Sequence, residues 1–376
     1  MNELEGLRSR IDEIDRKIVE LYKERMDIVS EVAGLKRDTG GSIYRPDREE
    51  AIIRKVIDMA GEKNAHKIRL LYKTIMRQSR ERQYEILSET MSAEEIIGTD
   101  IVRGTDIARV AYAGLPGSYT QSAAARMYPE AEMEGLVHFD NVMAAVAEGA
   151  CDAGVLPIYN TTEGIVADVY EGLMKRSLYI SDSLALPISH CLLGVKGSEI
   201  SGIKCVLSHP QALGQCADYI REHGWTPLTD INTSVAAQKI AQEGNPANAA
   251  IASAMSAELY GLQIIEQDIN DSVFNKTRFI AVTKQPMIAP EANRISLCFT
   301  LPHESGSLSN ILSVAADYRI NLVNLQSLPL PQKPWEYRFY MDITGHVDSR
   351  EIRSILCMLF NELEEIRFLG NYVDSD

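Results

Sequence analysis

The sequence predicts a multidomain protein in which an all-α region, an α/β region and an α+β region follow one another. Three observations predict this order. Residues 1–90 repeat apolar side chains at helical spacing, residues 107–284 alternate short apolar runs with alanine-rich helical stretches, and residues 294–376 alternate strand-like and helix-like segments. Residues 91–106 lose this periodicity and are expected to be a linker.

The composition excludes several classes of function. A net charge of −15 argues against a nucleic-acid partner, and any anion site must be a local cationic pocket. No apolar run reaches the ~18 residues of a membrane span, and the N-terminus lacks the apolar core of a signal peptide. Six cysteines without CxxC pairs, and seven histidines without ligand spacing, predict a reduced cytoplasmic protein with no structural metal.

Apolar residues at the N-terminus recur every three or four positions, which predicts one amphipathic helix over roughly residues 1–36. Arg25 takes the position in this stripe between Leu21 and Ile28. A guanidinium on an apolar face is costly unless an anion meets it. Two interpretations stay open: Arg25 reaches the rim of the stripe, or it belongs to an anion site inside a helical bundle. The stripe consists of Leu4, Leu7, Ile11, Ile14, Ile18, Leu21, Ile28, Val32 and Leu35.

Neighbouring cations favour the anion site. Lys36 shares a helix face with Arg25 to within ~20° and lies ~16 Å from it along the axis. Arg8 points ~100° away from Arg25, so we expect it to serve a partner's site. The helix is ~50 Å long, and the two shorter helices that follow cannot cover that length, so an intertwined helical dimer is expected.

Polar residues continue the pattern in the next two helices. The segment Tyr44–Glu49, with Pro46 in a first turn, opens the second helix. In the third helix Ser79 takes a stripe position and Gln83 follows four residues later. Such residues are either hydrogen-bonded within a core or contact a ligand, and the pattern leaves both interpretations open.

Residues 1–90 resemble the all-helical, AroQ-type chorismate mutases, in which three helices per chain form an interlocked dimer. The resemblance implies that Lys36 and Gln83 donate to the ether oxygen of the breaking bond and that Glu49 binds the ring hydroxyl. It also implies that Ser79 lies near a carboxylate. The substrate carboxylates are implied to bind Arg8 (from the partner chain), Arg25 and Arg48. The resemblance rests on Leu7-Arg8, Glu24-Arg25, Gly34-Leu35-Lys36, Arg48-Glu49, and Ser79 with Gln83.

This reaction suits the residue types. The rearrangement of chorismate to prephenate is unimolecular and needs no cofactor; the protein has to hold a dianion in its compact conformer and stabilise charge on the ether oxygen. The family often has an aspartate where Arg45 stands, which leaves the role of position 45 open.

In the middle region, three apolar runs end in polar turns that precede helices. The turns are Gly117–Thr120, Asn160–Gly164 and Ser208–Gln211. Backbone N–H groups and hydroxyls at helix N-termini can bind carboxylates, and three such turns after successive strands predict a ligand cleft at the strand ends. None fits a dinucleotide-binding or Walker loop.

Residues 107–284 resemble a prephenate dehydratase domain, which folds as two α/β subdomains around a cleft, similar to periplasmic binding proteins. The resemblance implies that Thr277 is the leading candidate for donating a proton or hydrogen bond to the leaving hydroxyl. Tyr159 stands where the family often has glutamate. The substrate-binding residues implied are Asn160, Thr161, Gln211, Arg278 and Phe279. The matching stretches are Gly114–Thr120, Gly154–Gly164, Ser208–Leu213 and Thr277-Arg278-Phe279.

Residues 294–376 read as strand, helix, strand, strand, helix, strand, which resembles a ferredoxin-like ACT domain, a regulatory module. The resemblance implies L-phenylalanine as an allosteric effector. In place of the family's Glu-Ser-Arg-Pro stretch this chain has Gln326-Ser327-Leu328-Pro329, which lacks both charges. The implied allosteric residues are Gly306, Ser307, Leu308, Gln326, Ser327 and Pro329.

Together the resemblances predict a bifunctional enzyme that converts chorismate to prephenate and prephenate to phenylpyruvate, without a cofactor, as a homodimer or homotetramer. Two alternatives stay open: a prephenate or arogenate dehydratase with a mutase-like dimerisation domain, and a non-catalytic sensor of aromatic ligands.

Overall fold

The computed structural model of the protein describes residues 3–104, 106–272, 274–330, 333 and 335–375. The chain divides into two compact units, one of residues 1–99 with 297–368 and one of residues 100–296 with 369–376. Among the described residues, no helix is both long enough and apolar enough to cross a membrane.

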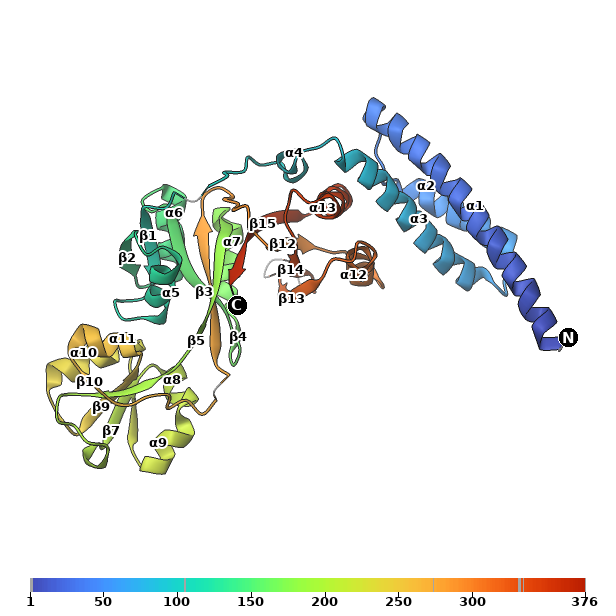
Figure 1. The fold of residues 1–376 in the computed structure, drawn as a ribbon. Helices are drawn as coiled ribbons and strands as arrows, with labels where there is room; N and C mark the ends of the chain where they lie inside the picture. Colours follow the sequence, from blue (N-terminus) through green and yellow to red (C-terminus); the bar gives the residue numbers. More distant parts are fainter. Residues whose placement is uncertain (1–2, 105, 273, 331–332, 334, 376) are drawn as a thin grey trace. The chain divides into compact units, whose positions relative to one another are not determined.

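The first unit begins with helices whose ends follow the expected sequence signals (Figure 1). The long first helix has acidic residues in its first turn and Lys36 and Arg37 in its last, as the helix dipole favours. Pro46 opens the second helix. The segment 91–106, expected to be a linker, contains a short fourth helix, because Ser92 and Glu95 form a capping box and Ile96 and Ile97 are buried. These helices are α1 (Glu3–Thr39), α2 (Pro46–Ala60), α3 (Ala65–Ser88) and α4 (Ala93–Ile97).

The C-terminal part of the chain has the strand–helix–strand–strand–helix–strand order expected from its sequence. Its first and last strands each begin in one unit and end in the other. Helix α13 packs against α3, where the hydroxyls of Ser88 and Ser354 lie 2.9 Å apart. The elements are β12 (Arg294–Thr300), α12 (Ser307–Asp317), β13 (Leu322–Pro329), β14 (Tyr337–Thr344), α13 (Arg350–Glu362) and β15 (Ile366–Ser375).

The second unit consists of two α/β lobes. In lobe 1, β1 pairs in parallel with β2 and β3, and β11 lies antiparallel between β3 and β5. The end of β15 adds to β5 in parallel. Lobe 1 contains β1 (Arg109–Ala113), α5 (Tyr119–Met127), β2 (Glu132–Leu136), α6 (Phe139–Glu148), β3 (Ala153–Asn160), β4 (Gly164–Ile165), α7 (Ala167–Arg176), β5 (Tyr179–Pro187) and β11 (Lys276–Thr283).

Lobe 2 is a five-stranded sheet in the order β10-β6-β9-β7-β8, with a buried apolar cluster on each face. The chain passes between the lobes twice, from β5 to β6 and from β10 to β11. Lobe 2 contains β6 (Cys191–Gly194), the 3₁₀ turn η1 (Ile200–Gly202), β7 (Cys205–Ser208), α8 (Pro210–Gln215), α9 (Ala217–His223), β8 (Thr226–Thr229), α10 (Thr233–Glu243), β9 (Asn248–Ala252), α11 (Ala254–Tyr260) and β10 (Gln263–Glu266).

Candidate functional sites

The helical region brings four of the predicted mutase residues together. Arg25, half-buried on α1, donates a short hydrogen bond from Nη1 to Ser79 Oγ on α3. Lys36 lies 11 residues after Arg25 on α1, and its Nζ donates at 3.1 Å to Oε1 of Gln83, one turn after Ser79 on α3. Gln83 Nε2 donates to the Ser79 carbonyl oxygen at 3.0 Å. The charge that Arg25 places in the apolar stripe therefore faces polar groups of α3.

Arg45 and Arg48 place two further positive charges near Lys36. Burial, together with the positive charges of Arg45 and Arg48, lowers the pKa of the Lys36 ammonium. Arg45 and Arg48 are exposed and form no ion pair within the described part of the chain. Three neighbouring cations with few counter-charges are suited to bind a dianion, and Arg45 belongs to this set although the family often has an acid there.

Glu49, the predicted partner of the ring hydroxyl, is bound by Arg80. Arg80 Nη1 lies 2.7 and 2.6 Å from the two carboxylate oxygens of Glu49, and Arg80 Nε lies 2.7 Å from Glu362 Oε1 on α13. Burial alone would lower the pKa of Arg80, but Glu362 and Glu49 outweigh it and raise the pKa. Arg80 thus orients the Glu49 carboxylate and joins it to the C-terminal part of the unit.

Arg8 does not join the other mutase residues within one chain. It is exposed on the N-terminal half of α1, where the apolar stripe is exposed as well: Ile11, Ile14 and Ile18 keep 56%, 56% and 57% of their surface accessible. Of the described residues of α1, only Ala33 is buried.

The second unit contains a cavity of about 480 Å³, partly open to solvent and lined by residues of both lobes. Of the predicted dehydratase residues, Thr277, Asn160, Gln211 and Phe279 line it. Thr277 and Phe279 both lie on β11, two positions apart, so their side chains point to the same side of the strand.

Helix N-termini supply the polar character of this cavity. Helix α5 begins at the cavity after Ser118, whose hydroxyl accepts from the Gln121 N–H, and α10 begins there after Asn232, whose side chain accepts from the Val235 N–H. Among the described residues that line the cavity there is no lysine or arginine. An anion in the cavity would therefore be bound by hydroxyls, amides and the positive ends of helix dipoles.

Thr277 is held as a hydrogen-bond donor. The residue is 8% exposed, and its hydroxyl accepts from Asn160 Nδ2 at 2.8 Å, so its own proton is left to donate. Asn160 is in turn oriented by the loop that follows β3, because its Oδ1 accepts from the backbone N–H groups of Thr162 and Glu163.

Three residues singled out from the sequence do not line the cavity. The Thr161 hydroxyl accepts from the Lys276 N–H and donates to the Phe274 carbonyl oxygen, which ties the start of β11 to the loop after β3. Arg278 points to the other side of β11 from Thr277 and lies 3.5 Å from Asp374 Oδ2 on β15. Tyr159 pairs with Ile165 of β4.

Three other polar residues near the cavity were not predicted. Gln215 and His190 line it, and Asn275 Nδ2 donates to Gln215 Oε1 at 3.0 Å. Gln215 follows Gln211 by four residues on α8, a spacing that places both on one helix face and that could have identified it.

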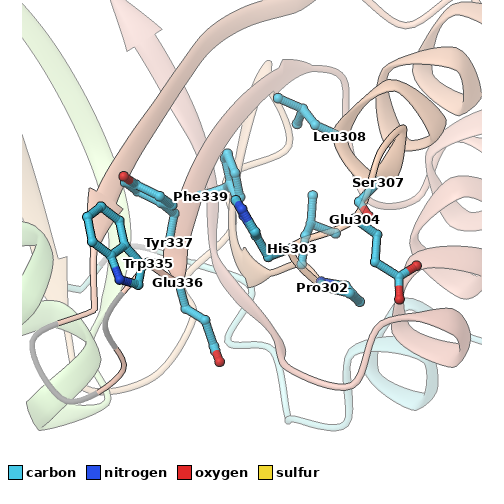
Figure 2. A pocket seen from close by; sticks show the side chains of 10 residues that line it. Pro302, His303, Glu304, Ser307, Leu308, Trp335, Glu336, Tyr337 and Phe339 are labelled. Carbon is cyan, nitrogen blue, oxygen red and sulfur yellow. The ribbon is translucent and has the colours of Figure 1, made fainter.

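A smaller pocket of about 130 Å³ lies in the C-terminal part of the first unit. Two of the residues implied to be allosteric, Ser307 and Leu308 at the start of α12, line it together with Glu304 and the aromatic residues Trp335 and Tyr337 (Figure 2). Trp335 is 81% exposed, so its indole is available to a ligand or a partner.

The other predicted allosteric residues lie outside this pocket. Gly306 is the left-handed residue that precedes α12, with φ of 95°. Gln326, Ser327 and Pro329 lie on β13, paired with β14, and Gln326 Nε2 donates to Asn324 Oδ1 at 3.0 Å.

Comparisons with known proteins match two separate segments of the chain to two families. Residues 7–84 match the family model "Chorismate mutase type II", and residues 110–287 match "Prephenate dehydratase". The bifunctional chorismate mutase/prephenate dehydratase of Enterobacter agglomerans is 30% identical over 99% of this chain and 96% of its own length. Arogenate dehydratase/prephenate dehydratase 1 of Arabidopsis thaliana is 33% identical over 77% of this chain and 78% of its own.

A solved structure extends the comparison. Prephenate dehydratase of Arthrobacter aurescens in complex with L-Phe has a TM-score of 0.64 and 27% identity, over 71% of this chain and 90% of that one. The two family matches and the bifunctional relative define a two-site enzyme in which a helical mutase is fused to an α/β dehydratase. The chain belongs to the family of bifunctional chorismate mutase/prephenate dehydratases.

Proposed function

We propose that this chain converts chorismate to prephenate in its helical region and prephenate to phenylpyruvate in its α/β unit, and that L-phenylalanine regulates it. One observation carries the proposal: two separate sets of donors, Arg25–Ser79 with Lys36–Gln83 and Thr277 with Asn160, occur in the two regions that match the two families.

In the mutase reaction, Arg25, Arg48 and the partner's Arg8 bind the carboxylates, and Ser79 lies beside the one that Arg25 holds. Lys36 and Gln83 face the ether oxygen, where negative charge grows as the bond breaks. Glu49, oriented by Arg80, binds the ring hydroxyl. The negative charge on the ether oxygen develops only in the transition state. Fixed cations that contact it therefore lower the reaction barrier without a covalent step.

The mutase site takes residues from two chains. The exposed apolar stripe of α1 requires a covering surface, and a second α1 offers the same length and the same period of apolar residues. Arg8 is then brought to the partner's Arg25 and Lys36. The chain is therefore a homodimer, or a tetramer built from such dimers.

In the dehydratase reaction, the N-termini of α5 and α10, with Gln211, hold the carboxylates of prephenate, and Asn160, whose amide is already paired within the chain, positions Thr277. Thr277 donates to the hydroxyl that leaves as carbon dioxide is lost. A threonine hydroxyl is a weak acid, so it acts by hydrogen bonding rather than by full proton transfer. Phe279, 2% exposed, forms part of the apolar wall against the ring. Arg278 holds Asp374, so its contribution to binding is indirect.

L-phenylalanine binds at the small pocket beside Ser307 and Leu308. Trp335 and Tyr337 offer aromatic surfaces to its ring, and Glu304 offers a carboxylate to its ammonium group (Figure 2). Gln326 and Leu328 replace two charges of the family's motif, so we expect weak inhibition.

The experiment that tests this function supplies purified protein first with chorismate alone and then, in separate assays, with prephenate, with arogenate and with other aromatic compounds. Loss of chorismate and appearance of phenylpyruvate support both activities. Conversion that stops at prephenate refutes the dehydratase assignment, and activity with prephenate but not chorismate supports a mutase-like dimerisation domain. Binding of aromatic compounds without any turnover supports a sensor, and faster turnover of arogenate than of prephenate would reassign the substrate.

A further inference from the structure

The two chain segments that connect the lobes of the second unit each place one polar side chain beside the cavity. His190 lies on the segment between β5 and β6, and Asn275 lies on the segment between β10 and β11. The two segments are joined by a hydrogen bond from the Ile188 N–H to the Asn275 carbonyl oxygen, 2.8 Å long. Neither side chain has a role in the proposed reaction so far, although His190 lines the cavity.

These side chains belong to a series of hydrogen bonds between side chains. Asn160 determines which group donates and which accepts in each of them. Two backbone N–H groups, those of Thr162 and Glu163, donate to Asn160 Oδ1 at 2.8 and 3.0 Å. The opposite orientation of this amide would point its NH₂ group at two other donors, which is costly in a buried site. Asn160 Nδ2 must therefore face its two acceptors, Asn275 Oδ1 and Thr277 Oγ1, both at 2.8 Å.

The orientation of the Asn160 amide also determines which groups donate and which accept in lobe 2. Because Asn275 Oδ1 accepts from Asn160, Asn275 Nδ2 is the group that donates to Gln215 Oε1, at 3.0 Å. Gln215 Oε1 can only accept, so His190, whose Nε2 lies 2.9 Å from it, carries its proton on Nε2. Burial lowers the pKa of His190, although the hydrogen bond to Gln215 opposes the shift, and the Tyr119 hydroxyl lies 3.4 Å from its Nδ1.

The consequence for the cavity is that two donors are left over, one from each lobe. Thr277 Oγ accepts from Asn160, which leaves its proton to donate, and Gln215 Oε1 is occupied by two donors, which leaves its NH₂ group. In the described part of the chain we find no acceptor for either group, and both residues line the cavity. In a cavity lined by no described lysine or arginine, such neutral donors carry much of the recognition of an anion.

We propose that His190 and Asn275 are positioning residues of the dehydratase reaction, which act through Gln215 and Asn160 to keep the Gln215 amide and the Thr277 hydroxyl donating into the cavity. The inference rests on the proposed function. His190 and Asn275 hydrogen-bond to Gln215 and Asn160 and do not contact the reacting atoms. Because both lie on the segments between the lobes, the same hydrogen bonds also hold the two donors at a constant separation.

The test compares two substitutions of His190 in the full-length protein. His190→Gln keeps an N–H donor at nearly the reach of imidazole Nε2, whereas His190→Leu keeps the bulk and removes the donor. We expect His190→Leu to lower dehydratase kcat/KM about 10- to 100-fold, mostly through kcat, and His190→Gln to remain within about threefold of the parent. Equal losses in both variants, or a change in thermal stability with kcat and KM unchanged, would overturn the proposal.

A double-substitution cycle separates positioning from general damage. Asn275→Ala alone is expected to lower kcat similarly, and Asn275→Ala with His190→Leu to lower it less than the product of the two single effects, because both act through Gln215. A loss of kcat in the double variant equal to the product of the two single losses would contradict a common action through Gln215. If His190→Leu does not fold, Asn275→Ala decides by the same kcat criterion.

Mutase turnover measured on the same samples is the internal control for folding. A parent protein without dehydratase activity would refute the proposed function itself, an outcome distinct from failure of the positioning role.

Discussion

The helical region and the α/β unit differ in how much of their apolar surface one chain can bury. Strand β3 of the α/β unit has six buried residues of eight, whereas α1 buries only Ala33 among its described residues. The cavity of the α/β unit is lined from both lobes of one chain, but Arg8 lies apart from Arg25 and Lys36. This difference supports the proposal that one chain supplies the whole dehydratase site, whereas the mutase site takes residues from a second chain.

The largest expected effect separates the two activities. Arg25→Ala should lower mutase turnover by about 10²–10³ while dehydratase activity on supplied prephenate survives, because the substitution removes a charged contact to the substrate. Thr277→Ala should do the reverse. Steady-state assays with chorismate and with prephenate measure this, and equal loss of both activities in either well-folded variant would contradict two independent sites.

A mixing experiment sharpens the claim that only the mutase site is shared. Arg8→Ala and Lys36→Ala proteins should each be poor mutases. Co-refolded in equal amounts, they should regain about a quarter of the parent mutase activity, because half of the dimers are mixed and each of these holds one native site. Dehydratase activity should stay unchanged throughout. No recovery, with mixed dimers shown by mass spectrometry, would contradict the shared site.

Two buried carboxyl groups in the first unit predict that its free energy of unfolding depends on pH. Burial raises the pKa of Glu362 to about 7, although Arg80 opposes the shift, and burial also raises that of Glu81 to about 7. The unshifted value is 4.5, so between 4.5 and about 7 the folded form binds more protons than the unfolded form. The free energy of unfolding of this unit therefore falls as the pH rises through that window.

Glu362→Gln tests this pH dependence. Denaturant unfolding followed by circular dichroism at pH 5 and pH 7.5 should give a smaller difference for the variant than for the parent, by on the order of 1–3 kcal/mol. Glu364→Gln is the matched control on a residue whose carboxyl contacts none of these groups among the described hydrogen bonds and ion pairs. An unchanged pH dependence in Glu362→Gln would show that this carboxyl does not titrate in the window.

The smallest effect is expected from L-phenylalanine. Calorimetric titration should show binding that Trp335→Ala weakens about tenfold, and inhibition of the dehydratase that strengthens in a Gln326→Glu, Leu328→Arg variant; coupling of ~1–3 kcal/mol is typical of allostery. Absence of binding heat and of inhibition at millimolar ligand would mean that this part of the chain has a structural role or binds another compound.

Much of the fold was predictable from local pattern. The spacing of apolar residues predicted α1 almost to its ends, the run Arg109–Ala113 is β1, and the order of the last six elements is confirmed. Periodicity determines such elements because each needs one continuous apolar face.

The sites were only partly predictable, because their residues are distant in sequence. Strand alternation implies that Thr277 and Arg278 face opposite ways, but only the packed lobes decide that Thr277 faces the cavity and Arg278 faces Asp374. His190, Gln215 and Asn275 come from three separate segments, and no spacing predicts their contact. The attachment of Arg80 to both Glu49 and Glu362 likewise depends on α13 packing against α3.

The central claim is that the mutase site requires a second chain and the dehydratase site does not. The most direct measurement is the activity of an Ile14→Glu, Ile18→Glu variant, which places two charges in the exposed stripe of α1, with oligomeric state followed by sedimentation. Arg16→Glu with Glu20→Lys, on the opposite face of the same helix, is the matched control. We predict that the stripe variant loses helical association and mutase turnover but keeps dehydratase turnover on prephenate. A variant without this association that still converts chorismate at the parent rate would contradict the account.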